Sequence, residues 1–274
     1  MLKTILLPRR YAYSDPTMRA PESSAYEIVH PGGRPDVLLF CDHASNRIPD
    51  EFAGLGLTPS LLADHIAFDI GAADLTGALS DRLDAPAVLS RFSRLLIDPN
   101  RALDHPQSIP ALSDGIRVPG NRKISAAEVA WRVATYYEPY HAAIDARIAV
   151  AKQSCRPVLI AIHSFTPDME GFTRPWHVAV LHDDDVRLAS RVLNEFTRYA
   201  ELVVGDNEPY TGYSDLTFTV PHHAGRNDLL SVVFEVRQDL LETATAIDNW
   251  AAVLDDVLAD PLAEIGVGKA LQQP

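Results

Sequence analysis

Three segments of the chain end an apolar run with a side chain that can bind a metal ion or move a proton. The letters VLLFCD precede His43, PVLIAI precede His163 and LSVVF precede Glu235. Imidazoles and carboxylates are the usual protein ligands of a catalytic zinc ion, and a glutamate beside such an ion can act as a general base. These residue types therefore predict the parts of a metal-dependent hydrolase.

The apolar runs also predict the elements that position these side chains. Runs of this length, rich in Val, Ile, Leu and Phe, are typical of buried strands in a parallel sheet. Because ligands bind at the carboxyl ends of the strands in an open α/β sheet, we expect the three side chains to share one edge. Strands are expected over residues 36–41, 86–92, 94–101, 157–163, 176–182, 201–204 and 231–237.

Segments with helical apolar spacing alternate with these strands. One helix is expected over 58–83, with Thr58 or Ser60 as its N-cap and Gly71 as a point where it can break. Further helices are expected over 125–153, 184–199 and 241–259.

The expected helix over 125–153 has a clear start and an internal proline. Ser125 and Glu128 form a capping box, and Pro139 should kink or split the helix.

The alternation of strands and helices predicts the fold class. We expect a single α/β domain over 35–274, with a mixed, mostly parallel central sheet flanked by helices, as in phosphorylase/hydrolase-like folds. Residues 1–34 are rich in Pro, Ser and Gly and are expected to form an irregular N-terminal arm. The segment 102–124 is expected to be a surface loop or lid, and 208–228 a loop that crosses the site.

Composition narrows the classes of partner. The net charge of −13 argues against nucleic acid, which needs clustered Lys and Arg to neutralise phosphates. There is no apolar run of about eighteen residues and no signal-peptide pattern at the start, so we expect a cytoplasmic protein that does not enter a membrane. A small anionic substrate remains compatible with local arginines.

The third ligand of the predicted metal site has two candidates. Asn46 lies three residues after His43, but a neutral amide is a weak zinc ligand. Asp69 carries the charge that such a site needs, although it could also be a solvated helix position. His65, four residues before Asp69, shares its predicted helix face. It is an alternative candidate for a residue that hydrogen-bonds to a metal ligand without binding the metal itself.

Glu235 and Arg237 lie on the same side of the last predicted strand, because they are two residues apart. One interpretation is a buried ion pair. The other is a general base for the attacking water, with a pKa tuned by its pocket.

Basic and polar residues cluster in SRFSRLLIDPNR, where Arg91, Arg94, Asn100 and Arg101 lie close in sequence. Guanidinium groups bind carboxylates in a bidentate way and stabilise oxyanion charge. His222 and His223 could donate hydrogen bonds to a substrate, although adjacent histidines are more often surface residues.

Seven segments resemble the N-formylglutamate amidohydrolase family, within the wider zinc carboxypeptidase-like superfamily. They run in the expected order over most of the chain. They are DHASNRIP (42–49), FDIGAADL (68–75), SRLLIDPNR (93–101), IHSFTP (162–167), RPWHVAVL (174–181), NEPYTGY (207–213) and FEVRQDL (234–240).

The resemblance implies a role for each candidate residue. It implies metal ligands at His43 and His163, the general base at Glu235, and a carboxylate clamp at Asn100 and Arg101. Arg94 or Arg91 would polarise the scissile carbonyl. A substrate with two carboxylates would also need a second cation besides Arg101, for which Arg174 and Arg237 are the candidates. The carboxypeptidase pattern His-x-x-Glu is here His43-Ala-Ser-Asn46, so the resemblance favours Asp69 as third ligand.

The expected function is hydrolysis of an N-acyl amino acid by a zinc enzyme, or one with another divalent metal. The leading substrate is N-formyl-L-glutamate, giving formate and L-glutamate as in the last step of histidine breakdown. One alternative is a related zinc deacylase or carboxypeptidase for another N-acyl amino acid or a peptide. The other is a metal-less binding protein for an acidic metabolite. The sequence is compatible with a monomer or a homo-oligomer.

Overall fold

The computed structural model describes residues 25–212 and 216–267. The expected N-terminal arm up to residue 24, and residues 213–215 of the expected loop across the site, lie outside the described residues. The expectation of an irregular arm is wrong at Tyr26–Val29, which forms strand β1 and pairs antiparallel with β3 (Ala87–Ser90).

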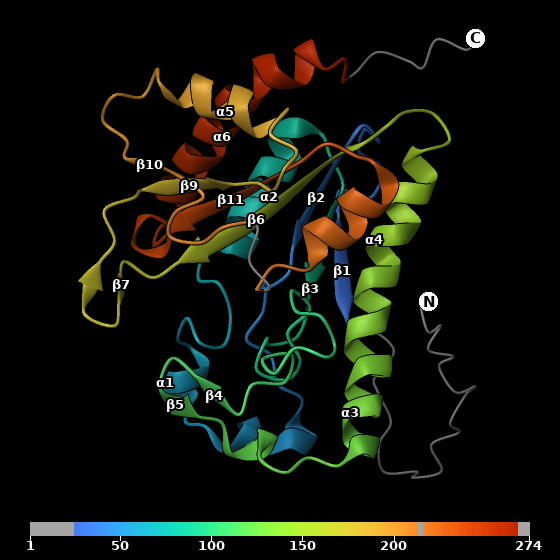
Figure 1. Ribbon diagram of the computed structural model, residues 1–274, viewed down its shortest axis with the longest axis vertical. Helices are drawn as coiled ribbons and strands as arrows, with labels where there is room; N and C mark the ends of the chain where they lie inside the picture. The colour runs from blue at the N-terminus through green and yellow to red at the C-terminus, as the bar shows by residue number, and fades with distance from the viewer. Residues whose placement is uncertain (1–24, 213–215, 268–274) are drawn as a thin grey trace.

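A seven-stranded sheet forms the centre of the described fold, in the order β1-β3-β2-β6-β11-β9-β10 (Figure 1). Strands β3, β2, β6 and β11 are parallel to one another, whereas β1 at one edge and the β9–β10 pair at the other run antiparallel to them. The mixed, mostly parallel sheet is therefore confirmed. The remaining strands are β2 (Val37–Cys41), β6 (Val158–Phe165), β9 (Val178–Leu181), β10 (Val204–Asp206) and β11 (Ser231–Arg237).

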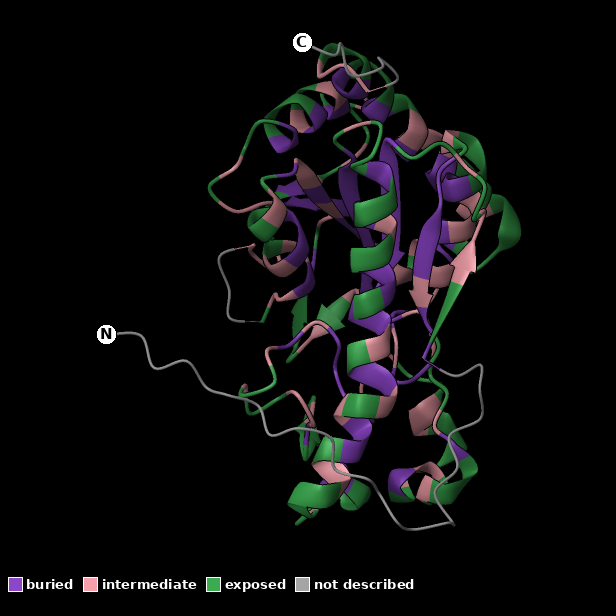
Figure 2. Cartoon of the chain, turned by 90° about the vertical axis from the view of Figure 1, so that its right-hand side faces the viewer, coloured by how far each residue is buried: buried purple, intermediate pink, exposed green. Residues whose placement is uncertain are grey.

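Helices cover both faces of the sheet, which explains why β2 and β6 are buried along their whole length (Figures 1 and 2). Successive side chains of a strand point to opposite faces. Leu39 and Ile160 pack with α2 (Ala72–Leu83), α5 (Ala189–Phe196) and α6 (Ala244–Glu264). Phe40 and Ala161 pack with α3 (Ala126–Arg132) and α4 (Glu138–Ala151) on the other face.

The expected helix over 125–153 is present, but Pro139 does not split it. A π-helical turn, Val133–Tyr137, joins α3 to α4, and the proline occupies the first turn of α4. A wide turn at this point tolerates the missing proline N–H and the bulk of its ring. At the start of α3, Ser125 Oγ accepts a hydrogen bond of 3.1 Å from the Glu128 N–H.

The expected helix over 58–83 is two helices, α1 (Pro59–Leu62) and α2, separated by an irregular segment. Gly71, the N-cap of α2, has φ of 80°, and a Cβ there would lie 2.5 Å from Leu241 Cβ. Asp69 therefore lies in a turn before α2, and its predicted place on a helix face with His65 is wrong.

The expected strand over 94–101 is a buried turn. Leu96 N–H donates to the Ser93 carbonyl at 2.9 Å, and Arg101 N–H donates to the Asp98 carbonyl at 3.2 Å. Pro99 cannot donate to a strand ladder, and the Ser93 and Asp98 side chains accept from nearby backbone N–H groups, so local bonds replace strand pairing.

Short elements complete the described chain. The segment 102–124 contains a hairpin of β4 (Leu112–Ser113) and β5 (Ile116–Arg117), which lies near α1 at one end of the sheet (Figure 1). A second hairpin joins β7 (Asp168–Met169) and β8 (Phe172–Thr173). The other helical turns are Asp50–Gly56, Pro119–Asn121, Pro221–Gly225 and Gln238–Leu240. Across the described residues, no helix combines the length and apolar character that a membrane span requires.

Candidate metal centre

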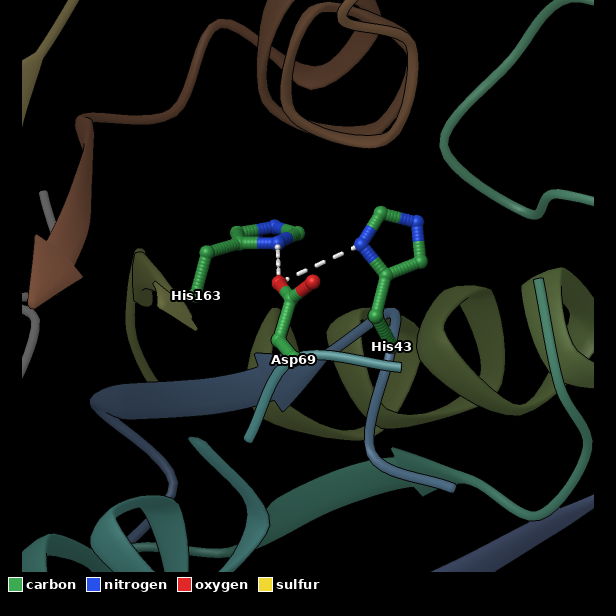
Figure 3. Close-up of side chains that lie close together, drawn as sticks. All are labelled: His43, Asp69 and His163. Carbon is green, nitrogen blue, oxygen red and sulfur yellow. Dashed lines mark hydrogen bonds and ion pairs between the residues drawn. The ribbon is translucent and has the colours of Figure 1, made fainter. Parts of the chain in front are cut away.

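His43, Asp69 and His163 come together at the carboxyl edge of the parallel strands (Figure 3). His43 lies two residues past β2, His163 lies within β6, and Asp69 projects from the turn before α2. Asp69 Oδ2 lies 2.8 Å from His163 Nδ1 and 3.3 Å from His43 Nδ1. Their ligand atoms all lie within 4.8 Å of one another, and all three side chains are buried. This triad could hold a metal ion.

The second nitrogen of each histidine faces another buried carboxylate. His43 Nε2 lies 2.8 Å from Asp98 Oδ1, and His163 Nε2 lies 3.3 Å from Asp42 Oδ2. Metal-binding histidines commonly donate their other N–H to a carboxylate, which fixes the ring and raises its basicity. The donor set and these supporting carboxylates therefore fit a divalent cation such as zinc.

Asp42 and Asp98 are residues that the sequence reasoning missed. Asp42 directly precedes His43, and Asp98 begins the DPNR motif, so both were inside segments already singled out. The sequence indicated their role only weakly, because an aspartate beside a turn is usually solvated or caps the local backbone. The Asp42 Oδ1 atom also accepts hydrogen bonds of 2.9 Å from Tyr140 and from Thr219.

The charges of this cluster favour a cation. Burial alone would raise the pKa of the Asp69 carboxyl, but His43 and His163 hold it below its usual range. Burial likewise opposes ionisation of Asp98, yet Arg94 and His43 keep its pKa well below its usual range. Burial lowers the pKa of His163, and Asp42 and Asp69 outweigh it and raise that pKa well above the usual value. Buried carboxylates that remain ionised and stabilise a positive charge in this way can also stabilise a divalent metal ion.

Glu235 lies beside this cluster without a hydrogen bond to it. It sits on β11 opposite His163 in the strand register and is 8% exposed. Within the described part of the chain its Oε2 atom has no hydrogen-bond partner. Burial, with a smaller contribution from the Asp69 charge, raises its pKa to about 7. A carboxylate with these properties can take up and release a proton near neutral pH.

Arg94 lies on the wall of the same pocket. Its Nε and Nη2 atoms donate to Asp98 Oδ2 at 3.2 and 3.0 Å, and its Nη1 atom donates to Asp69 Oδ1 at 3.4 Å. The guanidinium thus bridges a potential metal ligand and the carboxylate that orients His43.

Asn100 and Arg101 both line the pocket, but they have different partners. Asn100 Oδ1 accepts from the backbone N–H groups of Phe218 at 2.8 Å and Thr219 at 3.0 Å, so this oxygen organises the loop. Arg101 Nη1 donates to the carbonyls of Asn100 and Leu216. Its buried Nε atom has no hydrogen-bond partner among the described residues.

Three other candidates are bonded elsewhere. Arg91 pairs with Glu27 at 3.1 Å, Arg237 pairs with Asp239 at 2.8 Å, and Asn46 Nδ2 donates to the Leu62 carbonyl at 2.9 Å. None of Arg91, Arg237 and Asn46 is among the described residues that line the pocket.

Arg174 lies behind the pocket wall. Its guanidinium carbon is 5.0 Å from the ring centre of Tyr210, and it donates to the Thr166 carbonyl at 3.2 Å. Tyr210 lines the pocket, and burial raises the pKa of its hydroxyl. Tyr210 lies in the NEPYTGY motif, but its position in the sequence did not indicate a role.

The remaining histidine candidates also have defined partners. His65 lines the pocket and lies 3.0 Å from Asp114 Oδ2 on the β4–β5 hairpin. His222 and His223 lie in the helical turn Pro221–Gly225, outside the pocket lining described here. His223 is fully buried, so the expectation of two surface histidines is wrong for it.

These groups surround a cavity of about 590 Å³. Its described lining includes the triad, Glu235, Arg94 and Arg101, together with apolar side chains such as Ile66, Pro110 and Leu112. The cavity volume is within the usual range of about 300–1,000 Å³ for small-molecule sites.

The sequence also matches a known protein family. Residues 36–242 match the N-formylglutamate amidohydrolase family. The chain belongs to this family. The resemblance seen in the sequence motifs is thereby confirmed.

Two solved structures show how far the family likeness extends. A gene product of Agrobacterium tumefaciens is 35% identical, with a TM-score of 0.85 over 88% of this chain and 96% of its own. The N-formylglutamate amidohydrolase of Ralstonia eutropha JMP134 is 20% identical, with a TM-score of 0.69 over 89% of this chain and 99% of its own. The second likeness supports the fold. No curated protein matches the sequence significantly.

Proposed function

We propose that this family member is a metal-dependent amidohydrolase that cleaves the amide bond of an N-acyl amino acid. The leading substrate is N-formyl-L-glutamate, which would give formate and L-glutamate. The observation that carries the proposal is the buried triad of His43, Asp69 and His163 beside Glu235, whose Oε2 atom has no hydrogen-bond partner among the described residues.

The three triad residues would hold a zinc ion or another divalent metal. Such an ion polarises the substrate carbonyl and lowers the pKa of water. Asp98 and Asp42 orient the two imidazoles through their second nitrogens. We choose Asp69 over Asn46 as third ligand because the Asn46 amide is bonded to the Leu62 carbonyl.

Glu235 would act as the general base and then as the general acid. Its carboxylate takes a proton from the attacking water and returns it to the leaving amine nitrogen. A pKa of about 7 suits both steps, because the group is partly protonated at neutral pH.

Arginines would bind the anionic parts of the substrate. Arg94 lines the cavity and would stabilise negative charge that develops on the scissile carbonyl oxygen. Arg101, with Asn100 shaping its loop, would bind the α-carboxylate. Arg174, beneath Tyr210, is the candidate second cation for the glutamate side chain. Arg91 and Arg237 are not included, because Glu27 and Asp239 hold their guanidinium groups.

The test is hydrolysis of a matched panel of N-formyl and N-acetyl amino acids by the purified protein with one equivalent of zinc. We expect release of formate from N-formyl-L-glutamate to exceed release of acid from the other substrates. If the protein hydrolyses only the N-acetyl substrates, N-formyl-L-glutamate is not the substrate and the related deacylase is favoured. Binding of an acidic amino acid without turnover of any member would instead favour the metal-less binding protein.

A further inference from the structure

A chain of hydrogen-bonded groups runs from the surface to the turn over residues 98–101. Asp145 Oδ1 lies 2.9 Å from His223 Nδ1, and His223 Nε2 lies 2.9 Å from His141 Nδ1. His141 Nε2 in turn lies 3.0 Å from the Pro99 carbonyl oxygen. The Asp145 side chain is 48% exposed, whereas the His223 side chain is fully buried. The proposed reaction uses none of these side chains directly.

The partners at the two ends determine where the protons must be. The Pro99 carbonyl can only accept, so His141 Nε2 must carry a hydrogen. The Asp145 carboxylate can only accept, so His223 Nδ1 must carry one as well. The contact between the two rings needs a third. Two neutral imidazoles carry one N–H each, so the complete chain holds one additional proton, balanced by the Asp145 charge.

The turn at the inner end of this chain carries groups of the candidate site. Asp98 faces His43 Nε2 at 2.8 Å and also bonds to Arg94. Arg101, two residues after Pro99, lines the cavity. His141 is the nearer donor to the Pro99 carbonyl, since Thr219 Oγ1 lies 3.4 Å from it. A donor that holds this carbonyl restrains the turn that carries Asp98 and Arg101.

We propose that His141 is a positioning residue for this turn, donating from Nε2 to the Pro99 carbonyl, and that the complete chain out to Asp145 forms when His141 and His223 together take up one additional proton. The consequence for turnover rests on the proposed function, whereas the proton count and the contact to Pro99 do not.

The surroundings of the pair determine how it responds to pH. Burial lowers the pKa of His141 to about 4, and it also lowers the pKa of His223 although the Asp145 charge raises it. The shared proton is therefore gained in acid and lost as pH rises. The half-exposed Asp145 can then turn away, whereas His223 can still donate to His141 and His141 to Pro99.

Other charged and titratable groups pack around the two rings and modulate this response. From the same turn as His223 come His222, with its ring centre 4.8 Å from that of His223, and Arg226, which bonds to His222. Asp42, directly after β2, raises the pKa of both rings of the pair. The phenol rings of Tyr137 and Tyr140 lie 4.4 and 5.5 Å from the His141 ring.

The decisive variant is Asp145→Asn. An asparagine amide can donate to His223 Nδ1, so the whole chain is satisfied by two neutral rings and needs no additional proton. The measurement is an NMR titration of the imidazole nitrogens in the full chain. In the wild type we expect the His141 and His223 signals to move together in one step. In the Asp145→Asn protein we expect that step to disappear or to move to lower pH. Identical titrations in the two proteins would overturn the shared proton.

A second pair of variants tests the contact to Pro99. His141→Gln keeps an N–H donor near the Nε2 position, whereas His141→Leu removes it. We expect the leucine variant to lose up to about tenfold in kcat/KM and in zinc affinity, the lower end of the loss for groups bonded directly to a metal ligand, and the glutamine variant to retain most of both. Circular dichroism would verify that both variants fold. Full zinc affinity and activity in the folded leucine variant would overturn the positioning role. Absence of amidase activity in the wild type would count against the proposed function alone, because the NMR titration does not depend on turnover.

Discussion

Glu235 and His163 are direct neighbours in the pairing of the parallel strands β11 and β6. The pairing places a buried carboxylate next to an imidazole of the candidate metal centre. In the described structure the Glu235 Oε2 atom has no hydrogen-bond partner, whereas His163 faces Asp69 and Asp42. Under the proposed function these adjacent residues have different roles, His163 as a metal ligand and Glu235 as the general base.

Replacement of the proposed base should remove turnover without removing the metal. We expect Glu235→Gln to reduce kcat by about 10²–10⁴-fold, the usual contribution of a general base, with zinc stoichiometry unchanged. Steady-state kinetics and metal analysis on the same sample measure both. The matched control is Glu242→Gln, at an exposed position outside the cavity lining. Full turnover in Glu235→Gln would refute the assigned base.

The raised pKa of Glu235 should also affect the stability of the metal-free protein. An acid with a higher pKa in the folded chain than in the unfolded chain stabilises the fold below its unfolded pKa, and this contribution is lost as pH rises through the folded pKa. For Glu235 the window runs from its ordinary value of 4.5 to about 7. The advantage in Tm of Glu235→Gln over wild type should therefore grow across this window. A constant difference would show that the Glu235 pKa is not raised.

Loss of the carboxylate behind His43 should weaken metal binding without abolishing it. We expect Asp98→Asn to reduce zinc affinity by about 10–100-fold, because the amide orients the imidazole less well and does not raise its basicity. Competition with a chromogenic chelator measures this affinity. Asp104→Asn, at an exposed position nearby, is the control and should bind zinc like the wild type. Equal affinities in all three proteins would contradict the role of Asp98.

Arg132 should be important for stability. Its fully buried guanidinium donates to the Leu96 carbonyl at 2.8 Å, to Asn121 Oδ1 at 2.7 Å and to Glu128 Oε1 at 2.6 Å. Removal of one partner of a buried charged network leaves the others unpaired, so Arg132→Met should lower the free energy of unfolding by about 3–5 kcal/mol. Urea denaturation measures it. The exposed Arg122→Met control should change it by less than about 0.5 kcal/mol. A similar small change in Arg132→Met would contradict this role.

Much of the fold could be predicted from the sequence, because strands buried on both faces leave continuous apolar runs. The same signal failed at RLLID (94–98), where a buried turn is as apolar as a strand. A propensity pattern does not show that the Ser93 and Asp98 side chains satisfy the local backbone. The strand at Tyr26–Val29 was missed because an edge strand is short and half exposed.

Site residues that follow a strand could be predicted from the sequence. Those whose place in the cavity depends on tertiary contacts could not. His43, His163 and Glu235 follow long apolar runs, and the structure brings them to one edge. Arg91 and Arg94 are close in sequence, yet one pairs with Glu27 outside the cavity and the other lines it. Side-chain direction at the end of a strand or in an irregular turn is not encoded in residue spacing, so the contacts of Asp42 and Asp98 with the two histidines could not be predicted.

The central claim is that His43, Asp69 and His163 hold one divalent metal ion. The most direct test is the zinc stoichiometry after equilibrium dialysis of wild type, Asp69→Asn and Asn46→Ala. We predict one zinc per chain in the wild type and in Asn46→Ala, because the Asn46 amide is bonded to the Leu62 carbonyl. We predict greatly weakened binding in Asp69→Asn, since the ligand charge is removed. No stoichiometric zinc in the wild type, or undiminished zinc in Asp69→Asn, would contradict the assignment.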